Sequence, residues 1–157
     1  MLWSAFNLAF FGFLRVSEFT LDEQFNPNYH LSPRDITFHT SMQNPEYMAV
    51  IIKQSKTDPF RESITLTIAK SGTTVCAVHA LREYLLQHPQ LPADGPLFVL
   101  ESGKPLTRSV LSSNLRSLLH LIGLQASSYA THSFRIGAAT TAGAAGLPPW
   151  LIKTLGR

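Results

Sequence analysis

The residues best suited to chemistry are a histidine and an arginine that open a helix of small side chains. In ATHSFRIGAATTAGAAG (130–146), His132 and Arg135 are three residues apart and should project from one helix face. The first helical turn favours anions because its backbone N–H groups are free and the helix dipole is positive there. Arg135 adds a guanidinium fork that can bind two phosphate oxygens. A helix-capping His132 with a surface Arg135 explains this stretch equally well.

Two further segments carry cations in specific settings. Residues 2–18 are predicted to form an apolar helix. Its last part, FFGFLRVSE (10–18), contains Arg15 and Glu18. A cation in such a run is costly unless it is paired, and Glu18 is the local partner. A structural salt bridge is the simpler explanation. QSKTD places Lys56 near the tip of a predicted hairpin, where lysines are usually only solvated.

The elements that must position these residues are mostly helical. Periodicity and capping residues predict further helices over 74–88, 108–122 and 132–145, and a short last helix in PPWLIKTLG. YMAVIIK (47–53) and ESITLTI (62–68) are predicted to form an antiparallel hairpin, with DITFHT (35–40) as a candidate third strand. The predicted fold is mainly α with a small antiparallel β-sheet (α+β), in one domain over residues 1–157.

Composition narrows the function further. Residues 102–157 contain six Lys/Arg and no Asp or Glu, which indicates either an anionic partner or a solvated basic face. The sequence has no CxxC, no histidine pair at ligand spacing, no clustered carboxylates and no glycine-rich phosphate loop. We therefore expect no metal and no cofactor. The single cysteine, Cys76, favours an intracellular setting, and the opening apolar stretch is too short to span a membrane.

Together these segments resemble the catalytic domain of the tyrosine recombinases, the phage-integrase family. GFLRVSE matches the family's arginine-bearing helix end, QSKTD its hairpin lysine and HSFR its H-x-x-R pair, while LIKTLGR stands where the family has LLGH. Order and approximate spacing agree from about residue 2 to residue 157. The C-terminal segment SFRIGAATTAGAAGLPPWLIKTLGR most resembles integrase-like proteins of eukaryotic mobile elements.

The resemblance implies a role for each residue. Arg15 and Arg135 would bind the nonbridging oxygens of a scissile DNA phosphate, with His132 as a third donor. Lys56 would be the general acid that protonates the departing 5′-oxygen. Glu18 would orient Arg15. A tyrosine would attack the phosphate to form a 3′-phosphotyrosyl link, without a metal or cofactor.

The sequence departs from the family pattern at its end. None of the tyrosines, at positions 29, 47, 84 and 129, follows the LGR segment. We interpret Tyr129 as a packing residue. Arg157 stands where the family has a histidine or tryptophan and could donate to the phosphate. The expectation is a domain truncated at both ends, without the nucleophile and the preceding helical domain, and inactive as written.

Three functional hypotheses follow. The first is DNA recombination or integration, with double-stranded DNA as partner, protomers assembling on it, and a nuclear location in a eukaryotic host. The second is a non-catalytic DNA-binding remnant, in which the polar side of the 108–122 helix contacts DNA through Arg108, Ser112, Ser113 and Arg116. Ordinary solvent exposure explains that face equally well. The third is an unrelated helical interaction domain.

Overall fold

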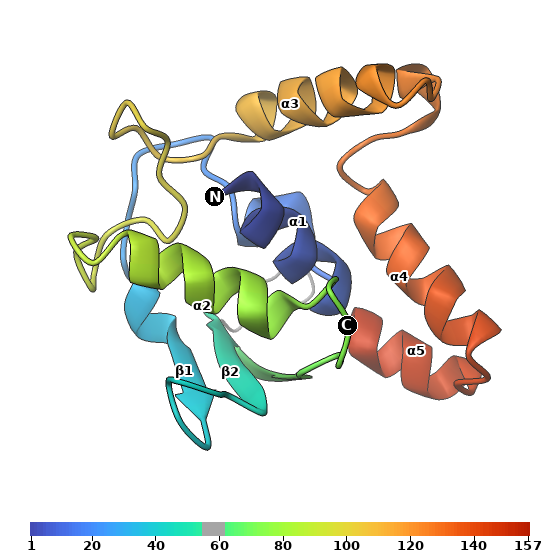
Figure 1. Cartoon of the computed structure of the whole chain (residues 1–157), viewed down its shortest axis with the longest axis horizontal. Coiled ribbons are helices and arrows are strands. Elements are labelled where there is room, and N and C mark those ends of the chain that lie inside the picture. The colour runs from blue at the N-terminus through green and yellow to red at the C-terminus, as the bar shows by residue number, and fades with distance from the viewer. Residues whose placement is uncertain (55–61) are drawn as a thin grey trace.

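The computed structural model describes residues 1–54 and 62–157, so that Lys56 lies outside the described residues. The described chain forms five α-helices, three strands and three single-turn 3-10 helices (Figure 1). The helices are α1 (Leu2–Phe11), α2 (Ala77–Gln87), α3 (Arg108–Leu121), α4 (Ser133–Ala144) and α5 (Pro149–Gly156). The strands are β1 (Ile36–His39), β2 (Tyr47–Ile52) and β3 (Ile64–Ala69), and the 3-10 helices are η1 (Val16–Glu18), η2 (Pro33–Asp35) and η3 (Ala126–Ser128). The predicted α+β fold class is confirmed.

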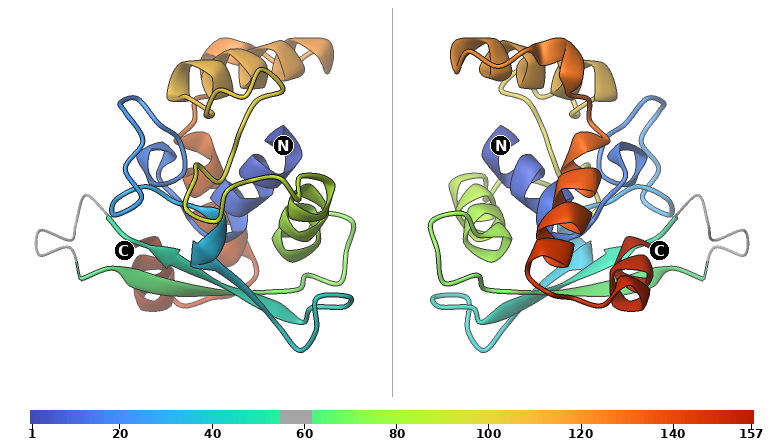
Figure 2. Two further views of the ribbon diagram at one scale, coloured as in Figure 1. Left: turned by 90° about the vertical axis from the view of Figure 1, so that its left-hand side faces the viewer. Right: turned by 90° about the vertical axis from the view of Figure 1, so that its right-hand side faces the viewer.

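The three strands form one antiparallel sheet with β2 in the middle. Val50 pairs with Ile36 of β1 on one side and with Leu66 of β3 on the other. Alternate residues of β2, namely Met48, Val50 and Ile52, are buried. Figure 2 shows the sheet on one side of the molecule and α3 on the opposite side. The candidate third strand at 35–40 is therefore a real strand, four residues long.

Helix α1 is the centre of the core and lies between α2 and α4 (Figure 1). Ala5, Leu8 and Ala9 are fully buried. The ring of Phe6 stacks on Phe134 of α4, with the ring centroids 5.0 Å apart. Small side chains on α4 allow this close packing, which fixes the backbone next to Arg135.

The predicted helix over 2–18 is wrong at its C-terminal end. Helix α1 stops at Phe11, and Phe13 has a φ of 52°, in the left-handed region that ends helices. The Leu14 N–H donates to the Ala9 oxygen at 2.9 Å, which closes the turn. Apolar periodicity could not reveal this break, because Phe13 and Leu14 are apolar and buried just as helical residues would be.

The other helices lie within a few residues of their predicted bounds. The largest shift is at α2, which begins at Ala77 and not at residue 74. Thr107 caps α3 as predicted, since its side chain accepts a hydrogen bond from the Val110 N–H. None of the helices in the described part of the chain has the length and apolarity needed to cross a membrane.

Candidate anion-binding site

Arg15 and Glu18 form a tight turn at the end of the α1 segment. The backbone N–H of Arg15 donates to Glu18 Oε2 at 2.8 Å, and Arg15 Nη1 donates to Glu18 Oε1 at 3.2 Å. The ion pair expected from the sequence is present, but it lies on η1 and not on a regular helix. The Glu18 side chain is 1% exposed and that of Arg15 is 19% exposed, so a buried carboxylate orients a partly accessible guanidinium.

Arg135 reaches the same place from α4. Its Nη1 donates to the Phe13 oxygen at 3.1 Å, and its Nη2 donates to the main-chain oxygens of Gly156 and Arg157. The left-handed backbone of Phe13 presents that oxygen, so the break in the predicted helix builds part of the site. Packing of the neighbouring Phe134 against α1 holds the base of the side chain.

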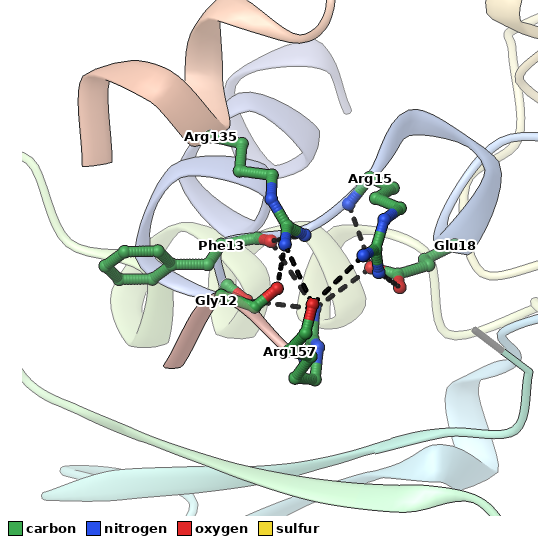
Figure 3. A network of polar contacts seen from close by, with 7 residues as sticks. Gly12, Phe13, Arg15, Glu18, Arg135 and Arg157 are labelled. Atoms are coloured by element: carbon green, nitrogen blue, oxygen red, sulfur yellow. Dashed lines mark hydrogen bonds and ion pairs between the residues drawn. The ribbon is translucent and has the colours of Figure 1, made fainter. Parts of the chain in front are cut away.

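The two guanidinium groups converge on one atom. Arg15 Nη2 donates to the main-chain oxygen of Arg157 at 3.0 Å, and Arg135 Nη2 donates to the same oxygen at 3.2 Å (Figure 3). This electron-rich main-chain oxygen occupies the point on which both cations are aimed. A phosphate oxygen accepts hydrogen bonds from the same kind of donor. We call Arg15, Glu18, Arg135 and Arg157 the arginine cluster.

Arg157 turns its side chain onto Glu18. Its Nη2 donates to Glu18 Oε2 at 3.0 Å and lies 3.4 Å from the oxygens of Gly12 and Phe13. The side chain is 6% exposed, and its Nε and Nη1 are buried without a hydrogen-bond partner in the described part of the chain. In this arrangement Arg157 braces Glu18, although its position in the motif suggested a donor to phosphate.

The arginine cluster carries more positive than negative charge, with three guanidinium groups around one carboxylate. Burial lowers the pKa of Arg135, and the nearby Arg15 charge lowers it further. Burial also lowers the pKa of Arg157, which Glu18 partly offsets. Cations that depress one another's pKa values are relieved when an anion joins them. The electrostatics of the cluster therefore favour an anionic ligand.

His132 is not part of this cluster. It occupies the position before α4 and is exposed, and its side chain makes no capping hydrogen bond. Its ring makes no hydrogen bond or ion pair with residues 1–54 or 62–157. His132 is therefore the N-cap residue of α4 by position, but its side chain does not cap the helix. Lys56 lies outside the described residues, so the structure does not place it.

The candidate DNA-binding residues of α3 lie along an open cleft. Arg108, Ser112 and Arg116 line one wall, and Tyr129 lies on the other wall, in the segment 129–131 that leads into α4. Ser113 is exposed beside them but does not line the cleft. Tyr129, interpreted from the sequence as a packing residue, is 40% exposed. Hydrophobic periodicity could not predict the exposure of Tyr129, because this residue lies in a connecting loop.

Sequence reasoning also missed a buried ion pair at the end of β2. Lys53 Nζ lies 2.6 Å from Asp35 Oδ2 and donates to Ser32 Oγ at 3.0 Å and to the main-chain oxygens of Pro27 and His30. The Lys53 and Asp35 side chains are 13% and 5% exposed. Within the described ranges, no group of three His, Cys, Asp or Glu side chains could hold a metal ion.

Comparison with solved structures identifies the fold. The chain is similar to the XerH site-specific recombinase, solved bound to its difH substrate in a pre-cleavage complex, with a TM-score of 0.67 and 17% identity. The match covers 97% of this chain and 38% of the recombinase chain. No protein-family model and no curated protein sequence matches this chain. At this identity the similarity establishes the fold.

Proposed function

We propose that this chain is a tyrosine-recombinase-type domain that binds double-stranded DNA and holds one backbone phosphate between Arg15 and Arg135. The observation that carries the proposal is the convergence of both guanidinium groups on a single oxygen. The fold shared with a DNA-bound recombinase supports DNA as the source of the phosphate. The acid-free basic segment 102–157 supplies further positive charge.

The arginine cluster suits phosphoryl transfer because its donors are fixed before the substrate arrives. Glu18 holds Arg15, and the Phe13 oxygen holds Arg135. Charge builds on the nonbridging oxygens as a nucleophile attacks phosphorus, and preorganised donors stabilise that charge. In the proposed reaction a tyrosine oxygen bonds to phosphorus, the bond from phosphorus to the 5′-oxygen breaks, and Lys56 protonates that oxygen. His132, exposed beside α4, is the proposed third donor.

The attacking tyrosine is not assigned to any residue of this sequence. DNA binding by the arginine cluster does not depend on it, so a non-catalytic DNA-binding domain is the second candidate function. An origin in a eukaryotic mobile element, a role in integration, assembly of protomers on DNA and a nuclear location are further proposals of the same account. The fold and the convergent arginines argue against an unrelated helical interaction domain.

The test is binding to a labelled mixed-sequence duplex, followed by fluorescence anisotropy. Arg15→Gln and Arg135→Gln should each weaken binding about tenfold or more, because each removes charge-assisted hydrogen bonds to one phosphate. Arg82→Gln is the matched control, since Arg82 pairs with Glu83 of α2 and its side chain, 20% exposed, is about as accessible as that of Arg15. Equal affinities for the wild type and both cluster variants would refute the proposal.

A further inference from the structure

The C-terminal end of α5 lies on the arginine cluster and supplies it with main-chain oxygens. Arg135 Nη2 donates to the oxygens of Gly156 and Arg157, and Arg15 Nη2 donates to the Arg157 oxygen (Figure 3). The last carbonyl groups of a helix lack partners within the helix and form its negative pole. The end of α5 therefore satisfies the donors that the proposed function assigns to a phosphate, and both cannot occupy them together.

Holding Arg157 in this position costs free energy. Its φ is 57°, in the left-handed region that residues other than glycine rarely adopt. Its Nε and Nη1 are buried and make no hydrogen bond to the residues that the structure describes. Buried donors without a partner are costly, and both nitrogens would regain water if the end of α5 moved away. Relief of this penalty would offset part of the hydrogen bonding that is lost on displacement.

Helix α5 packs mainly against α4, and Figure 1 shows it beside α4 at the edge of the molecule. None of residues 149–156 is buried, and the Trp150 side chain is 68% exposed. Ile152 contributes to the contact with α4, since a Cβ built at Gly143 would lie 3.7 Å from Ile152 Cδ1. A short helix with so little buried apolar surface can move away while the rest of the fold stays intact.

We infer that the end of α5 is an autoinhibitory segment, which occupies the arginine cluster in the free protein and leaves it when a DNA phosphate binds. This inference rests on the proposed function and adds a regulation of the same site. Only the fraction of molecules with α5 displaced can bind the phosphate, so the measured association constant is the intrinsic constant multiplied by that fraction. Changes that loosen α5 should therefore strengthen DNA binding, although they destabilise the protein.

Two variants at the contact between α4 and α5 test this in opposite directions, with duplex affinity measured by anisotropy. Ile152→Ala removes part of the contact, so it should raise the affinity about threefold or more and lower the melting temperature. Gly143→Ala adds a methyl group at ordinary contact distance from Ile152, so it should lower the affinity about twofold and raise the melting temperature. Trp150→Ala, which removes an exposed side chain of the same helix, is the matched control and should bind like the wild type.

Hydrogen exchange follows the displacement directly. A helix as short as α5, with eight residues, is marginal in water without packing. Its backbone amides should therefore exchange faster when the protein is saturated with duplex, while those of α2 keep their rates. Unchanged or slower exchange in α5 on binding would show that the segment stays in place and would overturn the inference.

The outcomes separate this inference from the proposed function. If Arg135→Gln weakens duplex binding but Ile152→Ala and Gly143→Ala bind like the wild type, the autoinhibitory segment is refuted and the proposed function stands. If Trp150→Ala raises the affinity as much as Ile152→Ala does, the effect is not specific to the contact with α4, and the inference is again refuted. If Arg135→Gln and both contact variants bind like the wild type, both proposals fail.

Discussion

Arg15 and Arg135, which lie near opposite ends of the chain, donate to the same main-chain oxygen at 3.0 and 3.2 Å. Arg15 is held by Glu18 on η1, and Arg135 is held by the Phe13 oxygen. The relative position of the two guanidinium groups is therefore set before any ligand binds, with the Arg157 oxygen between them. Preorganised donors lose little entropy on binding, so a phosphate oxygen that takes the place of the Arg157 oxygen would be held through a reaction.

Removing the carboxylate of the arginine cluster should destabilise the fold strongly. Glu18 is 1% exposed and pairs with both Arg15 and Arg157, so Glu18→Gln leaves buried cations uncompensated. We expect a loss of about 3 kcal/mol or more in the free energy of unfolding, measured with urea. Glu83→Gln is the control, because the Glu83 carboxylate is 56% exposed and should cost less than about 1 kcal/mol. Equal losses would contradict the account.

Charge alone should not replace Arg135. In Arg135→Lys the charge stays, but a single ammonium cannot reproduce the fork that reaches Phe13 and Arg157 together. Duplex affinity should fall about tenfold, whereas Arg82→Lys should leave it unchanged. Wild-type affinity for Arg135→Lys would show that the cluster acts only through its charge.

Removing only one partner of the Lys53–Asp35 ion pair should destabilise the fold. Lys53→Met leaves the Asp35 carboxylate, 5% exposed, without its cation. The free energy of unfolding should fall by about 3 kcal/mol. Combining it with Asp35→Asn removes the orphaned charge and should recover part of that loss, since Ser32 still donates to the side chain at residue 35. A double variant less stable than Lys53→Met would refute this explanation.

Tyr84 should make stability fall at high pH. Burial raises the pKa of its phenol, which accepts a hydrogen bond from the Val99 N–H at 3.1 Å. The folded state therefore keeps its proton where the unfolded state loses it, above the ordinary tyrosine pKa of about 10. The free energy of unfolding should fall more steeply above that pH for the wild type than for Tyr84→Phe. Parallel pH profiles for the two proteins would contradict this.

The sequence predicted the parts of the molecule that local patterns determine. β-Forming residues identified β2, and the alternation of apolar and polar residues identified β3. Thr107 identified the start of α3, and i, i+3 spacing identified the pairing of Arg15 with Glu18. These features depend on residues close in sequence. For the same reason, the predictions of the later helices were accurate to within a few residues.

The features that the sequence did not predict depend on tertiary contacts. The break at Phe13 follows from core packing that an apolar run does not reveal. The partners of Lys53 come from the segment 27–35, which is distant in sequence, as the ion pair with Asp35 and the hydrogen bond to Ser32 show. The exposure of Tyr129 depends on how α3 and α4 are arranged, which no local pattern specifies.

The most direct test of the central claim is a double-mutant cycle on duplex affinity with Arg15→Gln and Arg135→Gln, at one fixed salt concentration. If both arginines bind one phosphate, removing either one also weakens the contact that the other makes. The double variant should therefore lose less binding free energy than the sum of the two single losses. We expect a coupling energy of at least about 1 kcal/mol. Losses that add within about 0.5 kcal/mol would show that the two arginines act independently and would contradict a shared phosphate.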